Sequence, residues 1–196
     1  IFDDYAELHR VTQGKVGSDL LKKLEAKGIT GLAYWDNGFK VMSANKALQK
    51  PDDFKGVKMR VQSSKVLEAQ MKSLGALPQT LGFSEVYNAL MTGVVDGTEN
   101  PPSNLYTQKM HEVQKFVTVS NHGYLGYAVI VNKKFWDGLP ADIRAGLERA
   151  LKESTKYAND IARQDNEDAL AKVKASGKTQ VLNLTAEDKK TWKKAM

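Results

Sequence analysis

The stretch Lys55-Gly-Val-Lys-Met-Arg-Val-Gln-Ser-Ser64 decides how the rest of this 196-residue sequence is interpreted. Its apolar and β-branched residues predict a short buried strand from Val57 to Val61, and Ser63 or Ser64 is suited to begin a helix. This order places the Arg60 guanidinium near the carboxyl end of a strand, just before the free N–H groups of a helix N-terminus. Both features favour an anion, and a guanidinium binds a carboxylate through two parallel hydrogen bonds. An arginine on an edge strand, paired with a surface carboxylate, is the alternative interpretation.

The composition of the chain is that of an ordinary globular protein. Hydrophobic residues make up 41% and charged residues 27% of the sequence. No run approaches ~18 apolar residues, so no membrane-spanning helix is predicted. The absence of cysteine excludes disulfides, thiolate metal sites and a cysteine nucleophile. The chain starts at Ile1 without a leader and stops at Met196 inside a helical pattern, and we therefore expect a fragment of a longer protein.

The net charge of +6 raises the question of a nucleic-acid partner. The lysines fall in pairs spread along the chain, such as Lys22-Lys23 and Lys189-Lys190, mostly beside acids on predicted helices. This pattern is typical of solvated helix faces and differs from a single basic stripe. No nucleic-acid partner is therefore predicted, and a modest positive field suits a small anionic ligand equally well.

Hydrophobic periodicity predicts strands that alternate with helices, and hence an α/β fold with a mixed or parallel sheet. A turn is expected at Asp36-Asn-Gly38, and the nearly apolar segment Tyr124–Asn132 is expected to be a strand buried on both faces. A helix from Pro140 to about Ser176 would be too long for one lobe, so it is expected to bridge two lobes or to kink between them. The expected strands are Ile29–Trp35, Phe39–Ser43, Val57–Val61, Leu77–Leu81, Lys115–Ser120, Tyr124–Asn132 and Val181–Leu184.

The sequence contains no recognisable catalytic, cofactor or metal motif. His9, His111 and His122 lie far apart without the spacing of metal ligands, and no phosphate-binding or dinucleotide-binding loop is present. Asp96 and Glu99 could form an acid/base pair, although a loop carboxylate and a hydrogen-bonded glutamate are the favoured interpretation. Neither a metal nor a cofactor is predicted, and binding is favoured over catalysis.

The remaining candidates suit the binding of a small carboxylate. Arg60 and Lys40 supply positive charge, and Asn100, followed by two prolines, can donate and accept hydrogen bonds at once. Trp35 and Phe83 supply aromatic walls, as expected of a concave, mostly apolar site with a few polar groups. Taken singly, each aromatic residue is more typical of a core than of a pocket wall.

Four segments together resemble a known family. These are Phe54-Lys-Gly-Val-Lys-Met-Arg-Val61, Gly82-Phe-Ser-Glu-Val-Tyr-Asn-Ala-Leu90, Val95-Asp-Gly-Thr-Glu-Asn-Pro101 and Ser120-Asn-His122. They resemble signature segments of the substrate-binding proteins of TRAP transporters, of the DctP type for C4-dicarboxylates and related organic acids. The resemblance covers nearly the whole chain, with the segments in the family's order.

The resemblance implies a periplasmic-binding-protein-like (type II) α/β fold, in which a long helix spans two lobes. It implies a non-enzymatic periplasmic receptor that captures a small carboxylate between the lobes. The TRAP membrane subunits would then take up the ligand in a sodium-coupled step, and an enzyme acting on an organic acid is the alternative. Arg60 falls on the family's ligand-carboxylate arginine, Asn100 on its ligand asparagine and Phe83 on its pocket phenylalanine. Ser63 falls where members often contact the ligand.

The chain also departs from the family pattern. Lys40 stands where relatives often have a second arginine, and the opening part of a full-length member has no counterpart. We therefore expect a fragment with one complete lobe. Residues 1–31 would end the first lobe and cross over, and residues 32–122 would form the second lobe. Residues 123–196 would supply the return strand, the long helix and C-terminal elements of the first lobe. Apolar surface exposed by the missing part would favour self-association.

Overall fold

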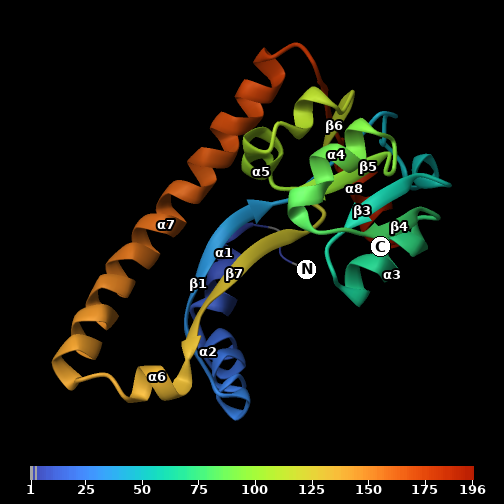
Figure 1. Ribbon diagram of the computed structural model, residues 1–196. Helices are drawn as coiled ribbons and strands as arrows, with labels where there is room; N and C mark the ends of the chain where they lie inside the picture. Colours follow the sequence, from blue (N-terminus) through green and yellow to red (C-terminus); the bar gives the residue numbers. More distant parts are fainter. Residues whose placement is uncertain (1, 3) are drawn as a thin grey trace. The chain divides into compact units, whose positions relative to one another are not determined.

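The computed structural model describes residue 2 and residues 4–196 (Figure 1). The chain forms two compact units, one of residues 1–37 and 125–164 and the other of residues 38–124 and 165–196. The chain passes between these units within strand β1 (Ile29–Phe39), at the start of strand β7 (Tyr124–Asn132) and within helix α7 (Ala141–Ala175). The long helix predicted from Pro140 is therefore confirmed, and its residues belong to both units.

The first unit combines a two-stranded sheet with helices. Strands β1 and β7 pair with each other. Asp4 begins the first helix by accepting a hydrogen bond from the Glu7 N–H at 2.7 Å, and Gly28, with φ of 74°, ends the helical segment before β1. The helices that lie wholly in this unit are α1 (Tyr5–Thr12), α2 (Lys15–Lys22) and α6 (Lys133–Asp137), with a 3-10 turn at Glu25–Lys27.

The turn predicted at Asp36-Asn-Gly38 is wrong, because β1 runs through these residues to Phe39. Gly38 instead lies where the Asn166 side chain comes so close to the backbone that a Cβ atom would not fit. A Cβ atom on Gly38 would lie 2.5 Å from Nδ2 of Asn166, which is 8% exposed. The Asn37 amide donates a hydrogen bond to the Tyr127 hydroxyl at 2.7 Å. Both residues thus make long-range contacts instead of the local bonds that make this triplet typical of turns.

Strand β7 is also exposed where the sequence predicted burial on both faces. Its residues are half-buried or exposed, and Tyr127 and Ile130 keep 47% and 53% of their surface accessible. Among the described residues β7 belongs to a sheet of only two strands, whereas burial on both faces is typical of a strand inside a larger, covered sheet. A run of apolar residues predicts a strand, but the layers around it determine its burial.

The second unit is built on a mixed six-stranded sheet with the order β4-β3-β5-β2-β6-β8. Strand β3 is parallel to β4 and β5, whereas β2 is antiparallel to both β5 and β6, and β8 is parallel to β6. The bounds are β2 (Val41–Ala44), β3 (Lys58–Val61), β4 (Leu77–Thr80), β5 (Gly97–Asn100), β6 (Phe116–Val119) and β8 (Gln180–Asn183). The predicted α/β class with a mixed sheet is confirmed.

Two hydrophobic clusters hold this sheet to its helices. One contains Phe54 and Trp192, whose rings meet edge to face with centroids 5.1 Å apart. The other joins Val117 of β6 to Val173 of α7. The helices of this unit are α3 (Lys65–Ser73), α4 (Val86–Met91), α5 (Pro102–Thr107) and α8 (Ala186–Ala195), with 3-10 turns at Pro51–Phe54, Phe83–Glu85 and Met110–Glu112. In the part of the chain that is described, no helix is long and apolar enough to cross a bilayer.

The C-terminal elements lie in the second unit, which differs from the division predicted from the sequence. Strand β8 pairs with β6 over four residues, from Phe116↔Gln180 to Val119↔Asn183. Trp192 of α8 is 2% exposed within the cluster that contains Phe54. The segment after α7 therefore completes the six-stranded sheet, whereas the sequence assigned it to the first lobe.

Candidate ligand-binding site

Arg60 is buried in the second unit and is anchored on one side only. It lies in β3, is 3% exposed, and donates from Nε and Nη2 to the Leu81 carbonyl oxygen at 3.0 and 2.8 Å. A guanidinium carries five N–H donors, so these two bonds leave donors available for a ligand. Among the described residues, no carboxylate forms an ion pair with Arg60. Burial lowers the pKa of Arg60, and the negative charge of Glu99 partly opposes that shift.

Phe83 covers the Arg60 guanidinium. The arginine Cζ lies 5.8 Å from the centroid of the phenylalanine ring, within cation–π range. Phe83 is 39% exposed. It lies two residues after Leu81, whose carbonyl oxygen anchors the arginine. The chain that leaves β4 therefore both orients the cation and shields one side of it from water.

Asn100 is the last residue of strand β5, and its side chain lies on the same face of the sheet as that of Arg60. The register pairs Arg60 with Thr98, and side chains two residues apart on a strand share a face. Asn100 is 1% exposed, and its Nδ2 donates to Thr98 Oγ1 at 3.2 Å. Its Oδ1 is buried and has no partner among the described residues. An unpaired buried acceptor is unfavourable, so a ligand that donates a hydrogen bond here would be stabilised.

The acidic residue before Asn100 lies in a separate buried network. Glu99 is 2% exposed and accepts from Lys40 Nζ at 2.6 Å and from His122 Nε2 at 2.9 Å. His122 Nδ1 in turn lies 2.7 Å from Ser120 Oγ. Burial raises the pKa of Glu99, but the bonds from His122 and Lys40 outweigh it and hold that pKa below its usual value. The Lys40 ammonium is therefore engaged by a carboxylate of the protein itself.

Helix α3 begins just beyond Arg60, as predicted. Ser64 caps it by accepting a hydrogen bond from the Leu67 N–H at 3.4 Å, and Ser63, one residue earlier, is exposed. The described residues contain no group of three or more His, Asp or Glu side chains that could hold a metal ion. The site can thus offer positive charge, an amide and an aromatic ring to a ligand.

The family described as "Bacterial extracellular solute-binding protein, family 7" matches residues 1–196. The chain belongs to this family. The resemblance to DctP-type receptors is thereby confirmed, and so is the prediction that the chain is not an enzyme. The Asp96 and Glu99 carboxylates have structural roles: Asp96 accepts a hydrogen bond from the Lys58 N–H at 2.8 Å, and Glu99 joins the buried network.

Relatives of this family 7 protein include proteins named for C4-dicarboxylate binding. The chain is 68% identical over 196 residues to "C4-dicarboxylate-binding periplasmic protein DctP" of Rhodobacter capsulatus, covering 100% of this chain and 59% of that protein. It is 41% identical over 199 residues to the protein of that name in Vibrio cholerae, again covering 59% of its length. This chain therefore spans less than two thirds of these relatives.

Solved structures of TRAP periplasmic solute-binding proteins have the same fold. One from Sulfurospirillum deleyianum, with bound succinate, gives a TM-score of 0.94 at 50% identity, and the match covers 100% of this chain and 64% of the chain in that structure. One from Pseudomonas aeruginosa, with bound L-malate, gives 0.97 at 41% identity and covers 100% and 68%. These matches confirm the periplasmic-binding-protein fold predicted for the family 7 chain.

The six residues predicted to bind ligand fall in both units of this family 7 protein. Arg60, Phe83, Asn100, Lys40 and Ser63 lie in the second unit, where Arg60 contacts Phe83 and shares a sheet face with Asn100. Trp35 lies in the first unit and donates from Nε1 to Thr155 Oγ1 at 2.8 Å. Sequence reasoning missed the network that engages Lys40, although the segments containing Glu99 and His122 were both recognised as family signatures.

Proposed function

We propose that this chain forms the greater part of a periplasmic TRAP-transporter receptor that captures a C4-dicarboxylate such as succinate or malate. The receptor would deliver its ligand to the transporter's membrane subunits for sodium-coupled uptake. The names of the relatives from Rhodobacter capsulatus and Vibrio cholerae support both the ligand class and the periplasmic location. The two related structures with succinate and L-malate support the same ligand class.

The observation that carries this proposal is the buried and incompletely paired Arg60 guanidinium. A buried charge is costly unless it is paired, so a carboxylate that reaches Arg60 gains a charge-assisted interaction where water does not compete. Phe83 limits access of water to the pair, and Asn100 offers a hydrogen-bonding group on the same sheet face. The ligand carboxylate would thus be bound by charge and oriented by hydrogen bonds.

The other predicted contacts remain predictions. Because Lys40 Nζ is bonded to Glu99, a direct contact with a second ligand carboxylate would require that ammonium to serve both groups. Ser63 is exposed just before the first turn of α3 and can donate from its hydroxyl. Trp35 also remains a prediction from the sequence alone, and its indole Nε1 donates to Thr155 Oγ1 within the first unit.

The test is calorimetric titration of succinate and L-malate into the full-length protein that contains this chain. Replacing Arg60 with glutamine leaves the ligand carboxylate without its charged partner, at a cost of about 2–5 kcal/mol. We therefore expect the Kd of the Arg60→Gln variant to rise at least ~30-fold. Arg149→Gln, at an exposed arginine of α7, is the matched control and should bind normally. Unchanged affinity in a folded Arg60→Gln variant would contradict the proposal.

A further inference from the structure

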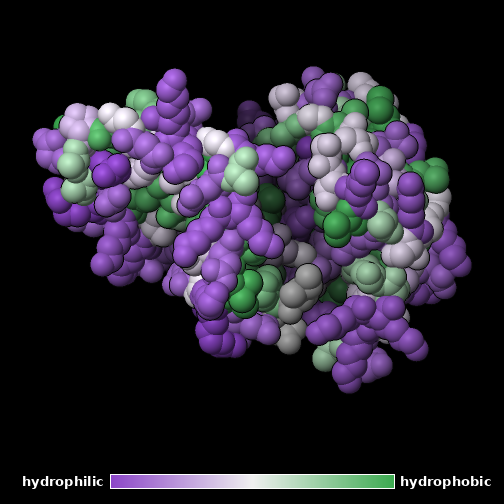
Figure 2. Space-filling view, turned by 90° about the horizontal axis from the view of Figure 1, so that it is seen from below, coloured by the Kyte–Doolittle hydropathy of each residue, from purple (hydrophilic) through white to green (hydrophobic). Residues whose placement is uncertain are grey.

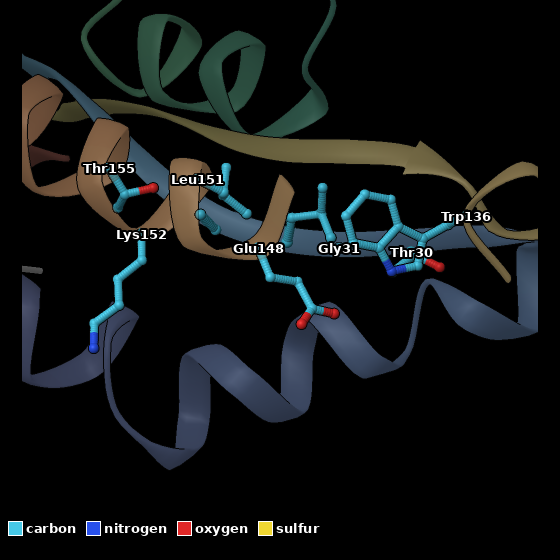
Figure 3. A pocket seen from close by; sticks show the side chains of 9 residues that line it. Thr30, Gly31, Trp136, Glu148, Leu151, Lys152 and Thr155 are labelled. Carbon is cyan, nitrogen blue, oxygen red and sulfur yellow. The ribbon is translucent and has the colours of Figure 1, made fainter. Parts of the chain in front are cut away.

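The binding of an anion by this chain depends on how the Arg60 guanidinium is held. A cavity of about 520 Å³ lies in the first unit, and its two charged lining residues are Glu148 and Lys152 (Figure 3). Because these two charges have opposite sign, that cavity offers an anion no net positive charge. The contacts that hold Arg60 in the second unit therefore determine how the described residues meet a carboxylate.

The segment from Leu81 to Phe83 supplies the contacts that orient Arg60. The Leu81 carbonyl oxygen accepts from Arg60 Nε and Nη2 at 3.0 and 2.8 Å, and the centroid of the Phe83 ring lies 5.8 Å from the arginine Cζ. The sheet holds this segment weakly, since β4 lies at its edge and the Leu81 N–H reaches the Val61 carbonyl oxygen only at 3.4 Å. The usual N···O distance of such bonds is about 2.7–3.2 Å, so the segment depends on a further attachment.

Glu85 supplies that attachment. Its Oε2 accepts a hydrogen bond from the Gly82 N–H at 2.8 Å, and the Glu85 N–H donates to the Gly82 carbonyl oxygen at 3.1 Å. Gly82 lies between Leu81 and Phe83, so this reciprocal pair of bonds fixes the backbone between the two residues that contact Arg60. The bond from a backbone N–H to a carboxylate is charge-assisted and stronger than its neutral equivalent.

Gly82 is suited to this contact. A Cβ atom at this position would lie 2.8 Å from Glu85 Oε2, so a larger residue would push the carboxylate away from the N–H that it accepts from. The φ angle of Gly82 is −58°, which other residues adopt without strain. The missing side chain therefore serves the approach of the carboxylate and is not required by the backbone conformation.

An exposed glutamate is in itself an ordinary surface residue. Glu85 is exposed, and hydrophilic side chains cover much of the face shown in Figure 2. Glu112 offers a direct comparison, because it is also exposed and also ends a 3-10 turn of the second unit. The Glu112 carboxylate accepts from Lys178 Nζ at 3.2 Å, whereas the Glu85 carboxylate accepts from the backbone beside the Arg60 anchor. The two residues therefore separate a general surface charge from a specific attachment.

We propose that Glu85 is a positioning residue for carboxylate binding, which holds the Leu81 carbonyl group and the Phe83 ring where they orient the Arg60 guanidinium. This inference rests on the proposed function, because it concerns the same site. It gives Glu85 the opposite effect to that expected from its charge, since a nearby negative charge repels an anion. Removal of the Glu85 side chain should thus weaken ligand binding, although it also removes a repulsive charge.

Calorimetric titration of succinate into the full-length protein that contains this chain tests the proposal. Glu85→Ala should raise the Kd at least ~10-fold, because the guanidinium loses its fixed geometry. Glu85→Gln, whose amide oxygen can still accept from the Gly82 N–H, should stay within ~3-fold of the wild type. Gly82→Ala should resemble Glu85→Ala, and the control Glu112→Ala should bind normally. Tighter binding by both Glu85 variants, or an equal loss in both, would overturn the proposal.

A second measurement needs no ligand. The Arg60 Nε–H resonance, assigned by its absence in Arg60→Gln, is followed by NMR in the ligand-free full-length protein. Its exchange with water should accelerate at least ~10-fold in Glu85→Ala, but not in Glu85→Gln or Glu112→Ala. Unchanged exchange in Glu85→Ala would overturn the inference whether or not succinate binds. If the wild-type protein binds no dicarboxylate while the exchange accelerates as expected, the proposed function fails and the positioning of Arg60 by Glu85 stands.

Discussion

Removal of the Glu99 charge is expected to destabilise the second unit strongly. In the Glu99→Gln variant the Lys40 ammonium, which is 4% exposed, loses the carboxylate that lies 2.6 Å away. His122, at 2.9 Å on the other carboxylate oxygen, loses a charged acceptor at the same time. Breaking a buried ion pair by removing one partner costs about 3–5 kcal/mol. We expect a loss of that size in the free energy of unfolding, measured by urea denaturation at pH 7.

A double-mutant cycle separates this loss from a general packing defect. Lys40→Met alone leaves the Glu99 carboxylate with only His122 as a partner. Lys40→Met combined with Glu99→Gln removes both charges of the pair, so that no buried charge is left without its partner. The double variant should therefore lose less stability than the sum of the two single variants, by roughly 1–3 kcal/mol. Additive losses, or a loss below ~1 kcal/mol for Glu99→Gln alone, would refute the buried ion pair as we describe it.

The same pair predicts how stability depends on pH. The folded-state pKa of Glu99 is lowered, because His122 and Lys40 outweigh the effect of burial. The stabilisation is therefore fully present above the unfolded carboxyl pKa of about 4.3, and it is lost as pH falls through the lower folded value. The wild-type urea midpoint should fall more steeply below about pH 4.3 than that of Glu99→Gln. Parallel pH profiles of the two proteins would contradict this assignment.

Two further changes test the fold of the second unit by urea denaturation. Phe54→Ala removes a fully buried ring that packs against Trp192, and the free energy of unfolding should fall by about 3–5 kcal/mol. A loss below ~1 kcal/mol would show that neighbouring side chains collapse into the space. Gly38→Ala places a Cβ atom 2.5 Å from Asn166 Nδ2 and should cost about 1–3 kcal/mol. Its control, Gly146→Ala in α7, meets nothing closer than 3.9 Å and should be neutral or stabilising, so equal effects would refute the close approach.

The features predicted correctly from the sequence are those that neighbouring residues determine. Strand β3 begins within one residue of the prediction, and Ser64 caps α3, because a β-branched run and a helix-capping serine act over a few residues. Gly28 and Gly177, which follow helical segments, have φ of 74° and 66°. Only glycine adopts that backbone conformation without strain, so its position in the sequence identifies the boundary.

The features missed from the sequence depend on partners that are distant along the chain. Asn166 is more than a hundred residues from Gly38, and its amide makes the glycine part of a close contact instead of a turn. Lys40 and Glu99 are 59 residues apart, so the sequence showed two charged residues without showing that they neutralise each other. The burial of β7 likewise depends on layers that its own apolar sequence does not contain.

The buried network also explains why Arg60 can serve a ligand. Glu99 is the acid whose negative charge acts on Arg60. Successive residues of a strand point to opposite faces of the sheet. The Glu99 side chain therefore projects away from the face that Arg60 shares with Thr98 and Asn100. Lys40 and His122 occupy both of its carboxylate oxygens on that opposite side. The negative charge is thus compensated locally, and the attraction between Glu99 and Arg60 is reduced. Because Lys40 keeps this acid paired, the Arg60 guanidinium retains positive potential that an incoming carboxylate can satisfy.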